Sequence, residues 1–206
     1  MPAAHAAGRP RPNPLRPWLW FGAACLLTLP AIAMWLDAPG VHWTASDFVI
    51  MGFLLATACG LYELGARISG DTAYRAAFGL AVLTGFLTVW ANLAVGMLGN
   101  EGNPANLMFA GVLAVAAVGA LLARFRTAGM AKAMLAAGVA QLAAVAIAVA
   151  LGGFEARELV LTGCFALPWF VAAVLFGRAR PAGRRANSRW SSRADGRHWQ
   201  GAGGGA

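Results

Sequence analysis

Charged side chains are scarce in this 206-residue chain: they make up 12% of it, and only eight carboxylates, three histidines and three cysteines are present. Soluble domains carry roughly 25% charged residues, so the chain lacks the polar surface that water requires. No histidine falls in an apolar run, and the sequence contains no Gly-x-Ser-x-Gly, Walker or His-Glu-x-x-His motif. We therefore expect no enzyme, no catalytic residue, no metal site and no cofactor.

The three cysteines, Cys25, Cys59 and Cys164, are far apart and all lie within apolar runs. A metal site or a redox pair would need partners nearby, and the histidines are elsewhere. We interpret the cysteines as small buried apolar side chains.

Long apolar runs dominate the sequence, which is 59% hydrophobic with a mean hydropathy of +0.63. About 20 apolar residues in a helix cross the roughly 30 Å hydrocarbon core of a bilayer. The pattern predicts an all-α, polytopic membrane protein, a six-helix transmembrane bundle over residues 17–177. The predicted helices cover residues 17–36, 48–66, 73–98, 104–123, 130–151 and 159–176.

The breaks between the runs contain residues typical of helix starts. Asp47, Asp71 and Asn103 can cap helices, and Pro104 suits a first helical position. Pro30 predicts a kink in the first helix. That helix could be read as a secretory signal, but its apolar run is long, which favours an uncleaved anchor.

The two ends of the chain differ from the middle. Residues 1–16 are basic and rich in proline, and residues 178–206 are rich in arginine; both predict disordered cytoplasmic tails. Fifteen of the sixteen Lys and Arg residues fall in these tails or beside alternate turns, and only Arg157 falls on the other side. By the positive-inside rule this predicts a bacterial inner-membrane protein with both termini in the cytoplasm.

Polar residues inside the predicted spans are few. Glu63 is the only carboxylate within a span, and Arg67 follows it at the spacing of a helical ion pair. We favour such a pair over a proton or ion site. Asn92 and Gln141 are expected to hydrogen-bond to neighbouring helices. Threonine hydroxyls, including those of Thr84, Thr88 and Thr162, are expected to bond to their own helix. Helices four and five are rich in Ala and Gly and predict the centre of packing.

The most distinctive segment is the hairpin from Trp90 to Phe109, which contains Asn92, Glu101, Asn103 and Asn106. These polar side chains could form a shallow external binding loop. The simpler interpretation is structural: glycines end one helix, Asn103 caps the next, and Asn92 or Asn106 ties the hairpin together.

At this hairpin the chain resembles a family of uncharacterised proteobacterial six-span inner-membrane proteins with a similar Trp-x-Asn-x-Ala-Val-Gly…Asn-Pro-Ala-Asn-Leu-Met motif. The resemblance extends from about residue 17 to 177. It implies a fold and a location, but no activity.

Expected partners follow from charge and apolar surface. The lipid bilayer surrounds the helices, and the arginine-rich tail is expected to contact anionic lipid headgroups rather than nucleic acid, although recruitment of a polyanion by the tail is an open alternative. The shortage of reactive groups favours a non-catalytic scaffold or modulator of membrane components, with a membrane protein or a second copy as partner. A small transporter or channel is the alternative.

Overall fold

A computed structural model describes residues 15–179 and contains helices but no strand in that range. In the described part six helical spans are long and apolar enough to cross a membrane. The first three are Arg16–Trp35 (α1), Ala45–Ile68 (α2) and Thr72–Ala94 (α3). The fourth joins Pro104–Asn106 (η1) to Leu107–Leu122 (α4), the fifth is Thr127–Leu151 (α5), and the sixth joins Ala156–Cys164 (α6) to Ala166–Arg178 (α7).

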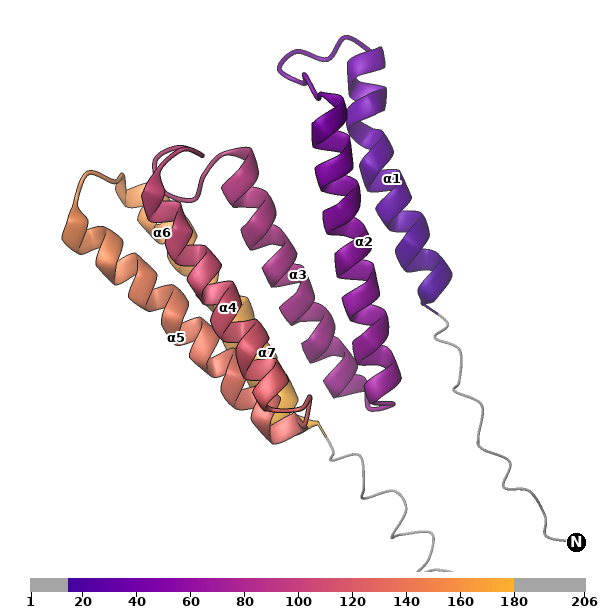
Figure 1. Ribbon diagram of the computed structural model, residues 1–206, viewed down its shortest axis with the longest axis vertical. Helices are drawn as coiled ribbons and strands as arrows, with labels where there is room; N and C mark the ends of the chain where they lie inside the picture. Colours follow the sequence, from indigo (N-terminus) through magenta and orange to yellow (C-terminus); the bar gives the residue numbers. More distant parts are fainter. Residues whose placement is uncertain (1–14, 180–206) are drawn as a thin grey trace, which may run out of the picture.

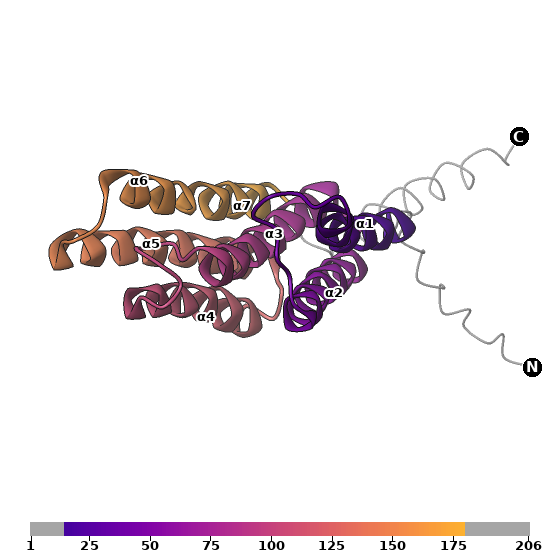
Figure 2. The ribbon, with the colours of Figure 1, turned by 90° about the horizontal axis from the view of Figure 1, so that it is seen from above.

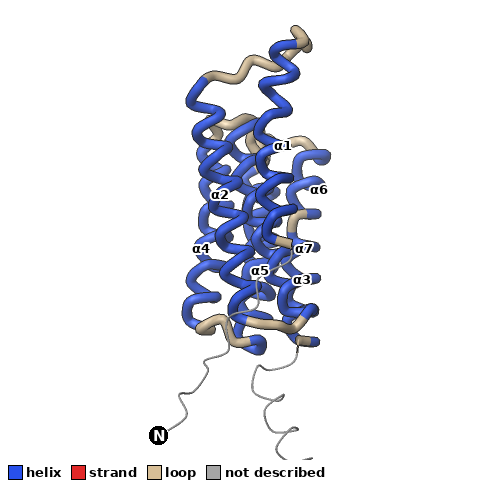
Figure 3. Tube along the Cα trace, turned by 90° about the vertical axis from the view of Figure 1, so that its right-hand side faces the viewer, coloured by secondary structure: helices blue, strands red, loops and turns tan. Residues whose placement is uncertain are grey.

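The helices run side by side, and the loops gather at two opposite ends of the bundle (Figures 1 and 3). At one end, here called the near end, α1 begins, α7 ends, and the turns at 69–71 and 123–126 reverse the chain. The far end carries the loops at 36–44, 95–103 and 152–155. Most of the two predicted tails lies outside the described residues, but Arg16 and Arg178 belong to helices α1 and α7 and not to tails.

The core lies among α3, α4, α5 and α7, where α5 packs against both α4 and α7. The prediction that helices four and five form the centre therefore needs correction, because α5 packs even more extensively on α7. Small residues allow the close approach: a Cβ added at Gly119 of α4 would lie 2.8 Å from the Cβ of Ala133 in α5. By contrast α1 packs mainly against α2 and has no buried residue.

Helix starts agree with most of the sequence interpretation. The Asp71 carboxylate accepts from the Tyr74 amide at 3.0 Å, and Asn103 accepts from the Ala105 amide at 2.9 Å. The prediction for Asp47 was wrong in detail, because Thr44 is the cap of α2 and Asp47 completes a reciprocal capping box with it. The first helix continues through Pro30.

Helix α3 ends at Ala94, four residues before the predicted end at 98. Its apolar continuation misled the prediction, because Met97 and Leu98 are buried in the loop without being helical. Gly96 turns the chain with a φ of +72°, and a Cβ there would collide with the backbone carbonyl of Asn100. Glycine is therefore required where the chain leaves the helix.

The last span is interrupted at Phe165, which separates α6 from α7. Pro168 has no backbone N–H, so it cannot donate to the carbonyl of Cys164. The helix predicted over 159–176 therefore consists of two segments, α6 and α7. It also starts earlier than predicted, at Ala156.

Candidate functional site

A carboxylate cluster joins α1 to α2 at the near end. The Glu63 Oε1 atom lies 3.0 Å from the Arg16 Nε atom and accepts from the Trp20 indole N–H at 2.6 Å, while Oε2 lies 3.4 Å from an Arg67 guanidinium nitrogen. The Glu63 side chain is only 11% exposed. The structure thus contains the Glu63–Arg67 pair that the spacing predicts and adds two partners from α1. The indole of Trp20 thus joins α1 to α2.

A second polar group lies in the core. The Gln141 side chain is fully buried and donates to the Thr162 carbonyl at 2.9 Å, next to the break between α6 and α7. The Thr162 hydroxyl donates to the Met97 carbonyl at 2.9 Å. The expectation for Gln141 agrees with this bond to a neighbouring helix. The expectation for Thr162 was wrong, because its hydroxyl bonds across the bundle to the far-end loop; Thr84 and Thr88 do bond to their own helix.

Asn106 organises the far-end loop. Its Oδ1 atom accepts from the Met97 and Leu98 amides at 3.1 and 2.9 Å, and its Nδ2 donates to the Leu98 and Asn100 carbonyls. Of the two asparagines considered for tying the hairpin, Asn106 does so. The Glu158 carboxylate at the start of α6 adds a bond from the Gly99 amide at 3.2 Å, which sequence reasoning missed because the two residues are 59 positions apart.

Asn92 behaves differently from the prediction. Its Nδ2 donates to the Thr88 carbonyl of its own helix at 2.7 Å and not to a neighbouring helix. A carbonyl can only accept, so the nitrogen must face Thr88, and the Oδ1 atom is left buried without a hydrogen-bond partner in the described structure. Buried polar atoms are usually paired, which makes this acceptor a feature to explain.

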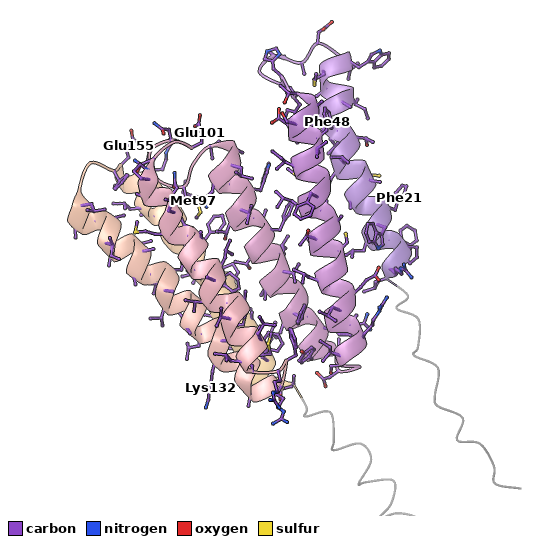
Figure 4. The ribbon with its side chains drawn as sticks, in the orientation of Figure 1. Phe21, Phe48, Met97, Glu101, Lys132 and Glu155 are labelled. Carbon is purple, nitrogen blue, oxygen red and sulfur yellow. The ribbon has the colours of Figure 1, made fainter. Side chains whose placement is uncertain are left out.

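Four of the predicted site residues line one hollow of about 480 Å³ at the far end, between the last turn of α3 and the start of α4. They are Asn92, Glu101, Asn103 and Asn106. Figure 4 shows Glu101 at the far end of the bundle, and its side chain has no ion-pair partner within residues 15–179. The other predicted residues, Glu63, Arg67 and Gln141, do not line this hollow.

A second hollow of about 400 Å³ is almost wholly apolar and lies between α2, α3 and α4. Seen from above, α2 and α4 lie on one side of the bundle with α3 set back between them (Figure 2). Residues of α2 and α4 therefore form its walls and residues of α3 its floor, including Leu61, Val82 and Ala117. Trp169 of α7 also lines it, and the indole N–H of Trp169 has no partner in the described structure.

The two hollows adjoin, because Val89 of α3 and Leu113 of α4 line both. They follow one another along α3 and α4: the far-end hollow carries four polar side chains among mainly apolar ones, and the other hollow is almost wholly apolar. We call this combined space the α3–α4 cleft. No motif predicted it, although the hairpin residues at its polar end were recognised as a possible binding loop.

The cysteines do not form a site. Only Cys59 is buried, and Cys25 and Cys164 are exposed, which corrects the expectation that all three are buried. Across residues 15–179 no three His, Cys, Asp or Glu side chains lie close enough together to hold a metal ion.

The fold defines the class: over the described residues, an all-helical protein with six helical spans long and apolar enough to cross a membrane. No protein-family model, no curated protein and no solved structure matches this chain.

Proposed function

We propose that this chain is a non-catalytic scaffold or modulator of the bacterial inner membrane that binds another membrane component in the α3–α4 cleft. The observation that carries the proposal is the cleft itself, an open and mainly apolar space along the spans. Its far end carries the side chains of Asn92, Glu101, Asn103 and Asn106, which we call the polar mouth. Open hollows with convergent polar groups are typical of binding sites. The Trp90–Phe109 hairpin supplies the polar side chains at the far end of the cleft.

The same proposal places both termini in the cytoplasm. Seven of the eight basic residues in the described part lie at the near end, and Arg157 alone lies at the far end. The seven are Arg16, Arg67, Arg75, Arg124, Arg126, Lys132 and Arg178. Positive residues are retained on the cytoplasmic side, so the polar mouth faces the periplasm. Reporter fusions at residue 101 and after residue 179 should report opposite compartments; the same compartment for both contradicts this orientation.

Site-directed photo-crosslinking tests whether the cleft binds anything. Ala117 and Val118 are adjacent and exposed on α4, but only Ala117 lines the cleft. A photoreactive phenylalanine analogue at position 117 of the full chain, irradiated in native membranes, should give one dominant adduct by mass spectrometry. The analogue at position 118 should give the distribution of bulk lipids. Equal adduct distributions at both positions reject the proposed function.

A small transporter or channel is the second candidate, supported by the break at Phe165 beside the unpaired Oε1 atom of Gln141. Interrupted spans are common in transporter sites. Glu63, the carboxylate within the predicted spans, is engaged by two guanidinium groups and an indole. Proton flux into liposomes that disappears in Glu63→Gln would favour transport over the scaffold.

A further inference from the structure

We propose that the occupant of the α3–α4 cleft is a lipid with a primary ammonium headgroup, the chemistry of phosphatidylethanolamine. The ammonium group lies in the polar hollow with Glu101, and one acyl chain follows the apolar hollow between α2 and α4. This inference rests on the proposed function, because it names the component that the cleft binds.

The shape of the cleft selects an amphiphile. Its apolar part is lined along α3 from Phe78 to Val89, and a helix rises 1.5 Å per residue, so this part is about 16 Å long. One leaflet accounts for half of the roughly 30 Å hydrocarbon core, which is about the same length. A single acyl chain therefore matches the apolar hollow in length. In the proposed arrangement the lipid passes Val89 and Leu113, which line both hollows, so that its headgroup lies in the far-end hollow.

The charge of the polar hollow selects the headgroup. Glu101 contributes a carboxylate without an ion-pair partner in the described structure, and no basic residue lines the hollow. An anionic headgroup would be repelled by this carboxylate, whereas a cation is attracted. A zwitterionic headgroup that ends in a cation is thus complementary to Glu101, with its ammonium group toward the carboxylate and its phosphate farther away.

Hydrogen bonding then distinguishes a primary ammonium headgroup from a quaternary one. Glu101, which lines the hollow, has two carboxylate oxygens that only accept when ionised. Asn92 also lines the hollow, and its Oδ1 atom is a buried acceptor without a partner in the described structure. The amide of Asn106 is already occupied by loop backbone groups, and the Oδ1 atom of Asn103 by the Ala105 amide. The charged group that the hollow presents to its ligand is therefore the Glu101 carboxylate, an acceptor. An ammonium group offers three N–H donors, and a trimethylammonium group offers none.

Native mass spectrometry of the full chain tests this directly. The protein is released from nanodiscs that contain equal amounts of phosphatidylethanolamine, phosphatidylcholine and phosphatidylglycerol with identical acyl chains. We expect phosphatidylethanolamine to be retained about tenfold over phosphatidylcholine, the effect of one charge-assisted hydrogen bond. Equal retention of these two lipids, or preference for phosphatidylglycerol, overturns the proposal.

Two matched pairs of variants locate the lipid. Glu101→Gln should lose most of the preference, while Glu155→Gln, which removes an exposed far-end carboxylate outside the cleft, should keep it (Figure 4). Ala117→Phe fills the apolar hollow and should lower retention, while Val118→Phe should not. Equal effects within either pair contradict the assignment. A protein adduct at position 117 without phosphatidylethanolamine preference would leave the proposed function standing and reject only this inference.

Discussion

Two regions of the molecule are held together by different forces. In the α1–α2 hairpin the ion pair between the two helices and the bond from Trp20 both meet at Glu63, and α1 buries no residue. The bundle of α3, α4, α5 and α7 depends on close packing of small residues around large ones such as Trp169 and Phe176. The ring of Phe176 packs edge-on against Tyr74, whose hydroxyl donates to the Phe125 carbonyl at 2.9 Å. The bonds of Glu63 to Arg16, Trp20 and Arg67 are here called the clamp, which joins the two helices at one place. Close packing joins helices along their whole contact surface.

This difference matters for the cleft, because its walls come from both regions. α2 belongs to the clamped hairpin, and α3 and α4 belong to the packed bundle. The Glu63 cluster joins α1 to α2, whereas α2 is held on the bundle by its packing on α3, where a Cβ added at Gly65 would collide with the Phe78 ring. The width of the cleft therefore depends on this α2–α3 packing. Changes to the two regions should therefore have separable effects.

The largest effect is expected from overpacking the bundle. Gly119→Leu places side-chain atoms where the Cβ of Ala133 already lies, and such overpacking costs about 1–3 kcal/mol. We expect a lower midpoint of thermal unfolding in detergent. Gly111→Leu, on the same helix, is the control, because a Cβ at Gly111 has no atom within 4 Å. Similar midpoints for the two variants would show that close packing of α4 on α5 does not hold the bundle.

A smaller and more local effect is expected at the far-end loop. Asn106→Ala removes the acceptor for the Met97 and Leu98 amides, and an unsatisfied buried group costs about 1–3 kcal/mol. Hydrogen exchange at these two amides should accelerate, while α1 and α2 are unaffected. Asn100→Ala, which removes only a bond to the Gly102 amide, should leave them protected. Unchanged exchange in Asn106→Ala would mean that Glu158 and Thr162 suffice to hold the loop.

The smallest effect on stability is expected from the clamp. Glu63→Gln removes both ion pairs, and because Arg16 and Arg67 are largely exposed the loss should be about 1 kcal/mol or less. Amides of α1 should exchange faster, whereas the unfolding midpoint of the bundle should hardly change. Glu155→Gln is the control for loss of a carboxylate. A large fall in the midpoint would show that the clamp supports the entire molecule and that the two regions are not separable.

The spans and most caps were predictable because they depend on neighbours in sequence. Asp71 and Asn103 cap the helices that directly follow them. The end of α3 was not predictable in the same way, since Met97 and Leu98 are apolar whether they continue a helix or fill a loop.

The candidate site was predictable only in part. The hairpin asparagines and Glu101 were recognised because polar residues beside a span are rare. The contacts of Trp20 with Glu63 and of Thr162 with Met97 join residues 43 and 65 positions apart. The local sequence pattern does not predict contacts over such separations. The apolar part of the cleft was missed for the same reason.

The sequence by itself determined that six segments are suited to cross a membrane, because the thickness of the hydrocarbon core converts directly into the length of an apolar run. Only the tertiary structure decided which faces of those segments meet, that Cys25 and Cys164 face outward, and that a cleft opens between α2, α3 and α4. The reason is physical: a span is apolar on all sides, and lipid provides no hydrophobic force that distinguishes a buried face from an exposed one. Close packing and a few polar contacts make that choice.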